Sequence, residues 1–505
     1  MAARTQRSES DALMIGFIRS RIRISLSTIA AAAIVFGCTN TVYKDFPGFE
    51  PPAQGAGQFI GYSNTSTKLT VCGNCHTEHQ ELWVTAKHAT AWADLQASGH
   101  AQKSCNNCHT VSTLGNNAAS DTVGYTGSPT ERYQDVQCES CHGGGQPHTN
   151  NTEDVASQPI PSIYVAVGLK TSCSGCHTGN HEPFVDEWSQ SAHGIVPDFA
   201  AGAGNTSCQP CHTGQGALLG PMGVENTTYK EINNDLTTQG PNGALTIVCA
   251  VCHDPHGSKN AGQLRWPVDT LDVGANLCAR CHNRRSVPDP TSNRGPHAPQ
   301  GPLLIGNNDV GWRPPNMSQV TRIFGSHGDS SLNKRLCATC HVFTSVSTDS
   351  SGIQFFSTGH LFLAIPCTDV NGKPIPGDCA ESQRTFAACA TSGCHASGDV
   401  AKNLLDTQVL TISQELTTLQ GLLNNTAKIP CTEYAVGSNV PFTTARGARF
   451  NYLLAAEAAS TQDAVCGNNR NLPPPVAKMS AATHNVPLIN QLLLNSIAQV
   501  QHDYP

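Results

Sequence analysis

The segment "TSCSGCHTGNHEPFVDEWSQSAHG", residues 171–194, concentrates two cysteines and three histidines in a short stretch. The whole chain shares this bias, with 23 Cys and 21 His among 505 residues and only 38% hydrophobic residues. Globular chains usually have about 45–50% apolar residues. We therefore expect something other than side chains to fill much of the interior. A formal charge of -7 argues against nucleic acid as the main partner.

The cysteines follow one pattern, Cys-x-x-Cys-His, which occurs eight times. The eight segments are "CGNCH" (72–76), "CNNCH" (105–109), "CESCH" (138–142), "CSGCH" (173–177), "CQPCH" (208–212), "CAVCH" (249–253), "CARCH" (278–282) and "CATCH" (337–341). This is the attachment signature of haem c: two thiols form thioethers with the haem, and the adjacent histidine ligates iron. Zinc sites do not require a histidine directly after the second cysteine, and no βαβ pattern supports a thioredoxin-like motif.

A ninth unit, "CATSGCH", has four residues between Cys389 and Cys394, and His395 follows the second cysteine. We interpret it as a further attachment unit, with a disulfide of these two cysteines as the alternative. The prediction is nine haem c groups, at sites 1 to 9 in chain order. The predicted thioether cysteines are Cys72, Cys75, Cys105, Cys108, Cys138, Cys141, Cys173, Cys176, Cys208, Cys211, Cys249, Cys252, Cys278, Cys281, Cys337, Cys340, Cys389 and Cys394. The predicted proximal iron ligands are His76, His109, His142, His177, His212, His253, His282, His341 and His395.

The remaining histidines are candidate second ligands for the irons. Iron ligated by two histidines has no open position for substrate, and such a haem carries electrons. The nine candidate distal ligands are His88, His100, His148, His193, His256, His297, His327, His360 and His484. His79 and His181 occupy the same place in two related segments and are the reserves.

The N-terminus has the features of a secretory signal. Three arginines between residues 19 and 23 precede the apolar stretch "ISLSTIAAAAIVFG" (24–37), and Cys38 follows it. The Gly-Cys ending resembles a bacterial lipobox, which predicts lipidation of Cys38; the alternative is an ordinary signal peptide with an unrelated cysteine. We expect an exported protein, a periplasmic or outer-membrane, cell-surface lipoprotein of a Gram-negative bacterium, held at the membrane by its lipid.

Four other cysteines remain for disulfides. They are Cys367, Cys379, Cys431 and Cys466. Disulfides are reasonable in an exported chain, and three connectivities are possible. Proximity in the sequence favours Cys367–Cys379 and Cys431–Cys466.

Sites 1 to 3 are followed by sites 4 to 6 at offsets of 101, 103 and 111 residues, with Trp83 and Trp188 in corresponding places. This indicates duplication of a three-haem module. The predicted divisions are a signal peptide with lipobox (1–38), a linker (39–70), two three-haem modules (71–170 and 171–260), a region with sites 7 to 9 (261–400) and a helical C-terminal region (401–505).

The C-terminal region is predicted to be helical. Its apolar residues recur at steps of four and three from Leu405 to Leu423, which forms one seam along a helix. Residues 442–460 and 485–501 also favour helices. The region is either a helical cap without a redox role or a dimerisation surface. The predicted fold class is mainly α with extensive loops, little or no β-sheet, and haems that form the core.

Several segments resemble a known superfamily. "VQCESCHGGGQPH", "CHDPHG", "RGPHAPQG" and "ARFNYLLAAEAAS…THNVPLINQLLLNSI" are similar to multihaem cytochromes c that include the tetrahaem electron acceptor of nitrification, hydroxylamine oxidoreductase, and the octahaem tetrathionate and pentahaem nitrite reductases. The resemblance implies close haem pairs in a continuous chain, mostly with two histidines on iron, and an axial role for His484. The chain has no Cys-x-x-Cys-Lys unit, which is typical of the catalytic haem of pentahaem nitrite reductases.

Three functions are consistent with these patterns. The first is a carrier of respiratory or extracellular electrons, with other cytochromes, quinol-linked donors or extracellular acceptors as partners and no catalytic residue. The second is a reductase or oxidase of a small nitrogen or sulfur compound at one open haem. The third is a homo-oligomer, the subunit of an extracellular haem filament.

Overall fold

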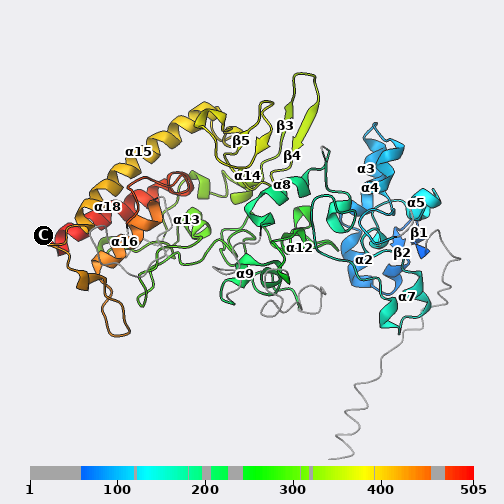
Figure 1. The fold of residues 1–505 in the computed structure, drawn as a ribbon, viewed down its shortest axis with the longest axis horizontal. Helices are drawn as coiled ribbons and strands as arrows, with labels where there is room; N and C mark the ends of the chain where they lie inside the picture. The colour runs from blue at the N-terminus through cyan, green and yellow to red at the C-terminus, as the bar shows by residue number, and fades with distance from the viewer. Residues whose placement is uncertain are drawn as a thin grey trace, which may run out of the picture. The chain divides into compact units, whose positions relative to one another are not determined.

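The computed structural model describes residues 58–118, 122–179, 181–195, 206–225, 243–307, 309–317, 322–391, 393–456 and 472–505. All nine motif histidines and all candidate distal histidines lie within these ranges. The predicted signal peptide, Cys38 and Cys466 lie outside the described residues, as does most of the 39–70 linker. In the described part, short helices and long loops dominate (Figure 1), so the prediction of a mainly α fold is confirmed.

Most attachment motifs form a single helical turn, which brings cysteines three residues apart to one side. The turns at the motifs are η2 (Cys72–Asn74), α4 (Asn106–His109), α6 (Cys138–His142), η7 (Ser172–Gly175), α9 (Gln209–His212), α12 (Cys249–Cys252), α14 (Cys337–His341) and η16 (Ala387–Ala390). The other short helices are α2 (Thr77–Trp83), η3 (Lys87–Thr90), α3 (Ala91–Ala97), η4 (Lys103–Cys105), α5 (Gly124–Gly127), η5 (Glu131–Tyr133), α7 (Gln146–Asn150), η6 (Val155–Ser157), α8 (Phe184–Gln190), η8 (Ala192–Gly194), α10 (Gly214–Leu219), η12 (Ala261–Gln263), α13 (Gln300–Ile305), η13 (Pro315–Met317), η14 (Ser326–Gly328), η15 (Glu381–Gln383), η17 (Cys431–Tyr434) and α17 (Ala481–His484).

The strands of the described residues form three small antiparallel pairs. They are β1 (Tyr62–Asn64) with β2 (Leu69–Thr70), β3 (Ser345–Thr348) with β4 (Gln354–Ser357), and β5 (Cys367–Thr368) with β6 (Pro374–Ile375). Cys367 forms a disulfide with Cys379 just beyond β6, with the two Cα atoms 6.0 Å apart. Cys431 is also disulfide-bonded.

The two related N-terminal segments fold alike. The indole N–H of Trp83 donates to the carbonyl of Val136, 3.0 Å away, and that of Trp188 donates to the carbonyl of Ile247, 2.8 Å away. Each of these acceptor residues lies two positions before the first cysteine of a motif. The backbone N–H of Val136 donates to His88, and that of Ile247 donates to His193. Each tryptophan therefore holds an attachment motif beside a candidate distal ligand.

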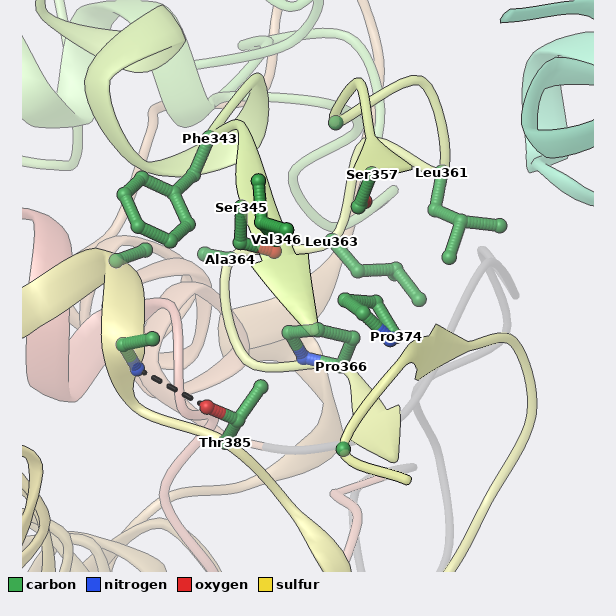
Figure 2. A pocket seen from close by; sticks show the side chains of 14 residues that line it. Phe343, Ser345, Val346, Ser357, Leu361, Leu363, Ala364, Pro366, Pro374 and Thr385 are labelled. Atoms are coloured by element: carbon green, nitrogen blue, oxygen red, sulfur yellow. Dashed lines mark hydrogen bonds between the residues drawn. The ribbon is translucent and has the colours of Figure 1, made fainter. Parts of the chain in front are cut away.

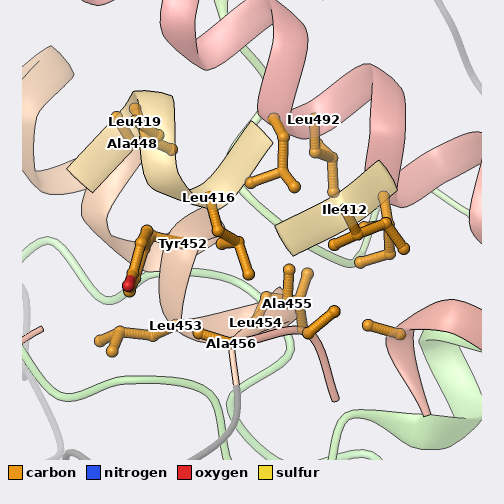
Figure 3. Close-up of a cluster of buried hydrophobic side chains, with 14 of the residues drawn as sticks. Ile412, Leu416, Leu419, Ala448, Tyr452, Leu453, Leu454, Ala455, Ala456 and Leu492 are labelled. Atoms are coloured by element: carbon orange, nitrogen blue, oxygen red, sulfur yellow. The ribbon is translucent and has the colours of Figure 1, made fainter. Parts of the chain in front are cut away.

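The C-terminal region contains the largest apolar cluster. Helices α15 (Gly398–Leu423), α16 (Thr444–Ala455) and α18 (Val486–Asp503) pack together around it (Figure 3). The predicted seam of α15 lies in this cluster, and Ile412, Leu416, Leu419 and Leu423 are fully buried. Because the chain's own helices cover the seam, dimerisation is not needed to bury it. No helix in the described ranges is both long and apolar enough to cross a membrane.

Glu415 on α15 makes the stability of this region depend on pH. Burial raises its pKa from 4.5 to about 7, and its Oε2 has no hydrogen-bond partner in the described residues. The pKa of Glu415 is higher in the folded protein than in the unfolded chain. The contribution of this group to the free energy of unfolding is therefore fully present below pH 4.5 and is lost as the pH rises towards 7.

We therefore expect Glu415→Gln to raise the free energy of unfolding by about 1 kcal/mol above pH 7. This value is smaller than the full pKa shift implies, because the side chain is half exposed and water screens its charge. The gain should vanish below about pH 4.5, which denaturant unfolding at the two pH values measures. An equal gain at both pH values would show that the carboxyl charge is not the cause.

Candidate haem centres

Eight of the nine motif histidines face one of the predicted distal histidines. The pairs, with the distances between ring centroids, are His76 with His148 (6.5 Å), His142 with His256 (6.3 Å), His177 with His88 (6.1 Å), His212 with His297 (6.0 Å), His253 with His360 (6.4 Å), His282 with His193 (6.2 Å), His341 with His484 (6.2 Å) and His395 with His327 (6.0 Å). Two imidazoles on opposite sides of one metal, each bonded at about 2 Å, have centroids about 6 Å apart. The spacing therefore fits one iron between each pair.

Hydrogen bonds fix the orientation of several of these rings. Nδ1 of His142 donates to the carbonyl of Pro159 (2.6 Å), that of His253 to Gly262 (2.6 Å), and that of His341 to Phe362 (2.9 Å). A carbonyl oxygen can only accept, so Nδ1 carries the proton and Nε2 keeps the lone pair that a metal needs. The residues present thus fit the coordination chemistry of haem iron.

Burial also keeps these imidazoles neutral. It lowers the pKa of His88, His193 and His360 to about 4, and that of His484 to about 3. A neutral imidazole is the form that ligates a metal. At neutral pH these four rings can therefore bind iron without first losing a proton.

Site 2 differs from the other eight. The ring of His109 makes no contact with another histidine in the described part of the chain, although its Nδ1 lies 3.0 Å from the carbonyl of Ala91. The prediction that His100 is a distal ligand is not supported, because His100 meets none of the motif histidines. It lies in an exposed turn after α3, where Gly99 has a φ of +71° and the His100 backbone N–H donates to Ser98 Oγ.

The two reserve histidines do not fill this gap. His79 stacks on the His256 ring with centroids 4.2 Å apart and an interplanar angle of 17°. His181 lies edge-on to Phe356, at a centroid distance of 6.3 Å. Neither ring contacts that of His109 in the described residues.

None of the eighteen predicted attachment cysteines forms a disulfide in the structure. Cys389 and Cys394 are among them, so the alternative disulfide between these two is wrong. Five pairs of cysteine sulfurs from different motifs lie close enough to shift each other's pKa values. These pairs are Cys72 with Cys138, Cys108 with Cys176, Cys173 with Cys249, Cys211 with Cys281, and Cys278 with Cys337. Cysteines of three further pairs of motifs influence each other's pKa values, for example Cys141 with Cys173 (sites 3 and 4), Cys252 with Cys281 (sites 6 and 7), and Cys340 with Cys389 (sites 8 and 9).

These contacts order the sites in space. The cysteines of consecutive sites lie near each other in the order 1, 3, 4, 6, 7, 8 and 9. Among the described residues, the cysteines of site 2 lie near those of site 4 only, and the cysteines of site 5 lie near those of site 7 only. The histidines add a link between sites 3 and 6. His253 of site 6 and His256, which faces site 3, are three residues apart, so their two irons must lie close together.

An apolar cavity of about 150 Å³ lies beside the β3–β4 hairpin (Figure 2). Phe343, Leu361 and Pro366 form part of its wall. Ala388, immediately before Cys389, also lines it, and Phe343 lies two residues after His341. The cavity is therefore bounded by the segments that carry sites 8 and 9.

Sequence reasoning did not identify two residues that position these rings. Phe184 lies edge-on to both His177 (5.5 Å) and His360 (4.9 Å), and so separates the ligands of sites 4 and 6. Glu187 accepts hydrogen bonds from the loop that carries His360. The sequence contains only a weak signal for Glu187, which is its place directly before Trp188. In the related N-terminal segment, the corresponding residue before Trp83 is Leu82, so the two segments do not share a glutamate there.

The attachment motifs, the imidazole pairs and two family-model matches support the assignment of this chain as a multihaem c-type cytochrome, a haem-based electron-transfer protein. The model of the cytochrome c554 and c-prime family matches residues 71–143, and that of the doubled CXXCH motif matches residues 243–286. No curated protein and no solved structure matches the chain.

Proposed function

We propose that this cytochrome carries electrons over a distance, along nine attached haems, and that it belongs to a respiratory or extracellular electron-transfer chain of the cell envelope. The observation that carries the proposal is the set of eight facing imidazole pairs, 6.0–6.5 Å apart. Haem c supplies reversible one-electron chemistry at iron when bound. A pair of histidines on the iron of each of these eight sites leaves no coordination position for substrate and favours transfer over catalysis.

The order of the sites supports a route with two ends. The thiol contacts run from site 1 through sites 3, 4, 6, 7 and 8 to site 9. Sites 2 and 5 branch from sites 4 and 7. The chain's residues keep neighbouring sites close, because one short segment often serves two of them.

The proposed location follows from the leader and its cysteine. A lipid on Cys38 would hold the protein at the membrane surface, with donors and acceptors such as other cytochromes, quinol-linked proteins or extracellular acceptors within reach. Redox partners of this kind use small, transient interfaces. Metabolic labelling with a fatty acid tests the anchor, since wild type should incorporate label and Cys38→Ala should not.

Intact mass and spectroscopy of the mature protein test the main proposal. We expect a mass with nine haems, and a ferric spectrum in which eight haems are low-spin. Replacement of Cys389 and Cys394 by alanine should remove one haem from that mass. A count below nine in wild type, or high-spin signals from several haems, would contradict the chain of histidine-ligated sites.

A second candidate function rests on site 2. His109 lacks a facing imidazole in the described part of the chain, which favours a haem that can bind a small ligand and reduce or oxidise it. We expect cyanide or nitrite to bind at one haem per protein and binding to disappear when Cys105 and Cys108 are replaced by alanine. Absence of ligand binding by the wild-type protein would exclude this activity.

A further inference from the structure

A buried carboxylate anchors the loop that carries the candidate distal ligand of site 6. Glu187 lies on α8 and is only 4% exposed. Its carboxylate accepts hydrogen bonds from the backbone N–H of Thr358 (2.9 Å), the hydroxyl of Thr358 (2.7 Å) and the backbone N–H of His360 (2.8 Å). These bonds join segments more than 170 residues apart in the sequence. One side chain thus satisfies three donors of the 358–360 loop.

The same contacts reach the imidazole of His360. Its Nδ1 lies 3.2 Å from the carbonyl of Thr358 and 3.1 Å from the Thr358 hydroxyl. Because the carbonyl can only accept, Nδ1 must carry the proton, and the hydroxyl oxygen can accept from it as well. The hydroxyl proton is then donated to Glu187. This gives a chain from the imidazole N–H through the hydroxyl to the carboxylate.

Helix α8 also holds the other half of site 6. Trp188, next to Glu187, donates its indole N–H to Ile247, two residues before the attachment cysteine Cys249. The ring of His360 lies 6.4 Å from that of His253, the motif histidine of the same site. Adjacent residues of one helix therefore position both sides of this centre.

We propose that Glu187 is a positioning residue that, through Thr358, holds His360 as the second axial ligand of site 6 and increases the electron density of its imidazole. The proposal rests on the proposed function, since it requires a haem at Cys249 and Cys252. Partners of this kind orient metal-ligating histidines, and their loss typically weakens metal binding by about 10–100-fold.

The test compares Glu187→Ala, Glu187→Gln and Thr358→Val with wild type, each as mature protein with its haems counted by intact mass. In Glu187→Ala we expect nine haems and a high-spin ferric signal from one of them, because His360 no longer stays on iron. Glu187→Gln and Thr358→Val should remain mostly low-spin, with a raised reduction potential of one haem, because less negative charge reaches the imidazole. His360→Ala supplies the reference spectrum of an open site 6.

Glu81→Gln is the matched control, because Glu81 is an exposed glutamate on the related helix α2. Its spectrum and potentials should equal those of wild type. If Glu187→Ala does not mature, the potentials of the two milder variants decide the question. Nine haems with wild-type spectra and potentials in the Glu187 and Thr358 variants would overturn the positioning role. A wild-type mass without a haem at Cys249 and Cys252 would instead overturn the proposed function.

Discussion

Replacement of Cys278 and Cys281 by alanine, which removes the attachment residues of site 7, is expected to divide the electron route into two parts. Site 7 is the site whose thiols meet those of sites 5, 6 and 8. Electron transfer slows steeply with distance, so the loss of this centre should slow exchange between the group of sites 1 to 4 and 6 and the pair of sites 8 and 9, and should leave site 5 without its neighbour. Flash photoreduction followed by absorbance measures the rate of this equilibration.

The matched control removes a haem from a side branch. Replacement of Cys208 and Cys211 by alanine eliminates site 5, which also costs one haem, yet the contacts between sites 6, 7 and 8 remain. The control should equilibrate at nearly the wild-type rate. If both variants keep that rate, electrons pass from site 6 to site 8 by another connection, through Phe362, whose carbonyl accepts from His341 and whose ring lies 5.4 Å from that of His360.

Asn485→Ala is expected to destabilise the C-terminal region by about 3 kcal/mol. The Asn485 side chain is 1% exposed, and its amide donates to the carbonyls of Leu303 (2.9 Å) and Ile323 (2.8 Å). Its Oδ1 caps α18 by accepting from the backbone N–H of Leu488 (3.1 Å). Alanine leaves both carbonyls buried without these donors and removes the cap. Denaturant unfolding followed by circular dichroism measures the loss.

The same substitution should disturb two haem centres. His484, immediately before Asn485, faces His341 of site 8, and the carbonyl of Thr483 accepts from Nδ1 of His327, which faces His395 of site 9. We expect high-spin signals from these two haems to accompany the loss of stability. Gln491→Ala, at an exposed position on the same helix, is the control and should change neither. Loss of stability with wholly low-spin sites 8 and 9 would show that the ligands do not depend on this anchor.

The helical region therefore does more than cover the rest of the protein. A cap without a redox role was one interpretation of its apolar seam, and the seam of α15 is indeed buried against α16 and α18. Yet His484, the last residue of α17 and two residues before α18, lies against a motif histidine from a distant part of the chain. The helical packing and the geometry of site 8 are coupled through residues 483–485.

The attachment residues could be predicted from the sequence because thioether formation and proximal ligation need residues that are adjacent in the chain. Candidate distal ligands could be chosen as a group, and eight of the nine face a motif histidine. The mainly helical fold also followed from the short motifs and from the apolar seam. His100 lies at the surface in a glycine turn after α3, so its role as an iron ligand stays a prediction.

The pairing of histidines was decided only by the tertiary structure, because each distal ring comes from a segment whose approach depends on packing elsewhere. His88 faces His177 rather than the nearby His76, and His256 faces His142 rather than His253, which is three residues away in the sequence. The role of Glu187 has the same origin, since its hydrogen-bond donors lie in a loop far along the chain. In "TSCSGCHTGNHEPFVDEWSQSAHG" the local chemistry alone indicates where a haem attaches. Only the folded chain shows that this segment contributes to site 4, to site 7 through His193, and to site 6 through Glu187 and Trp188.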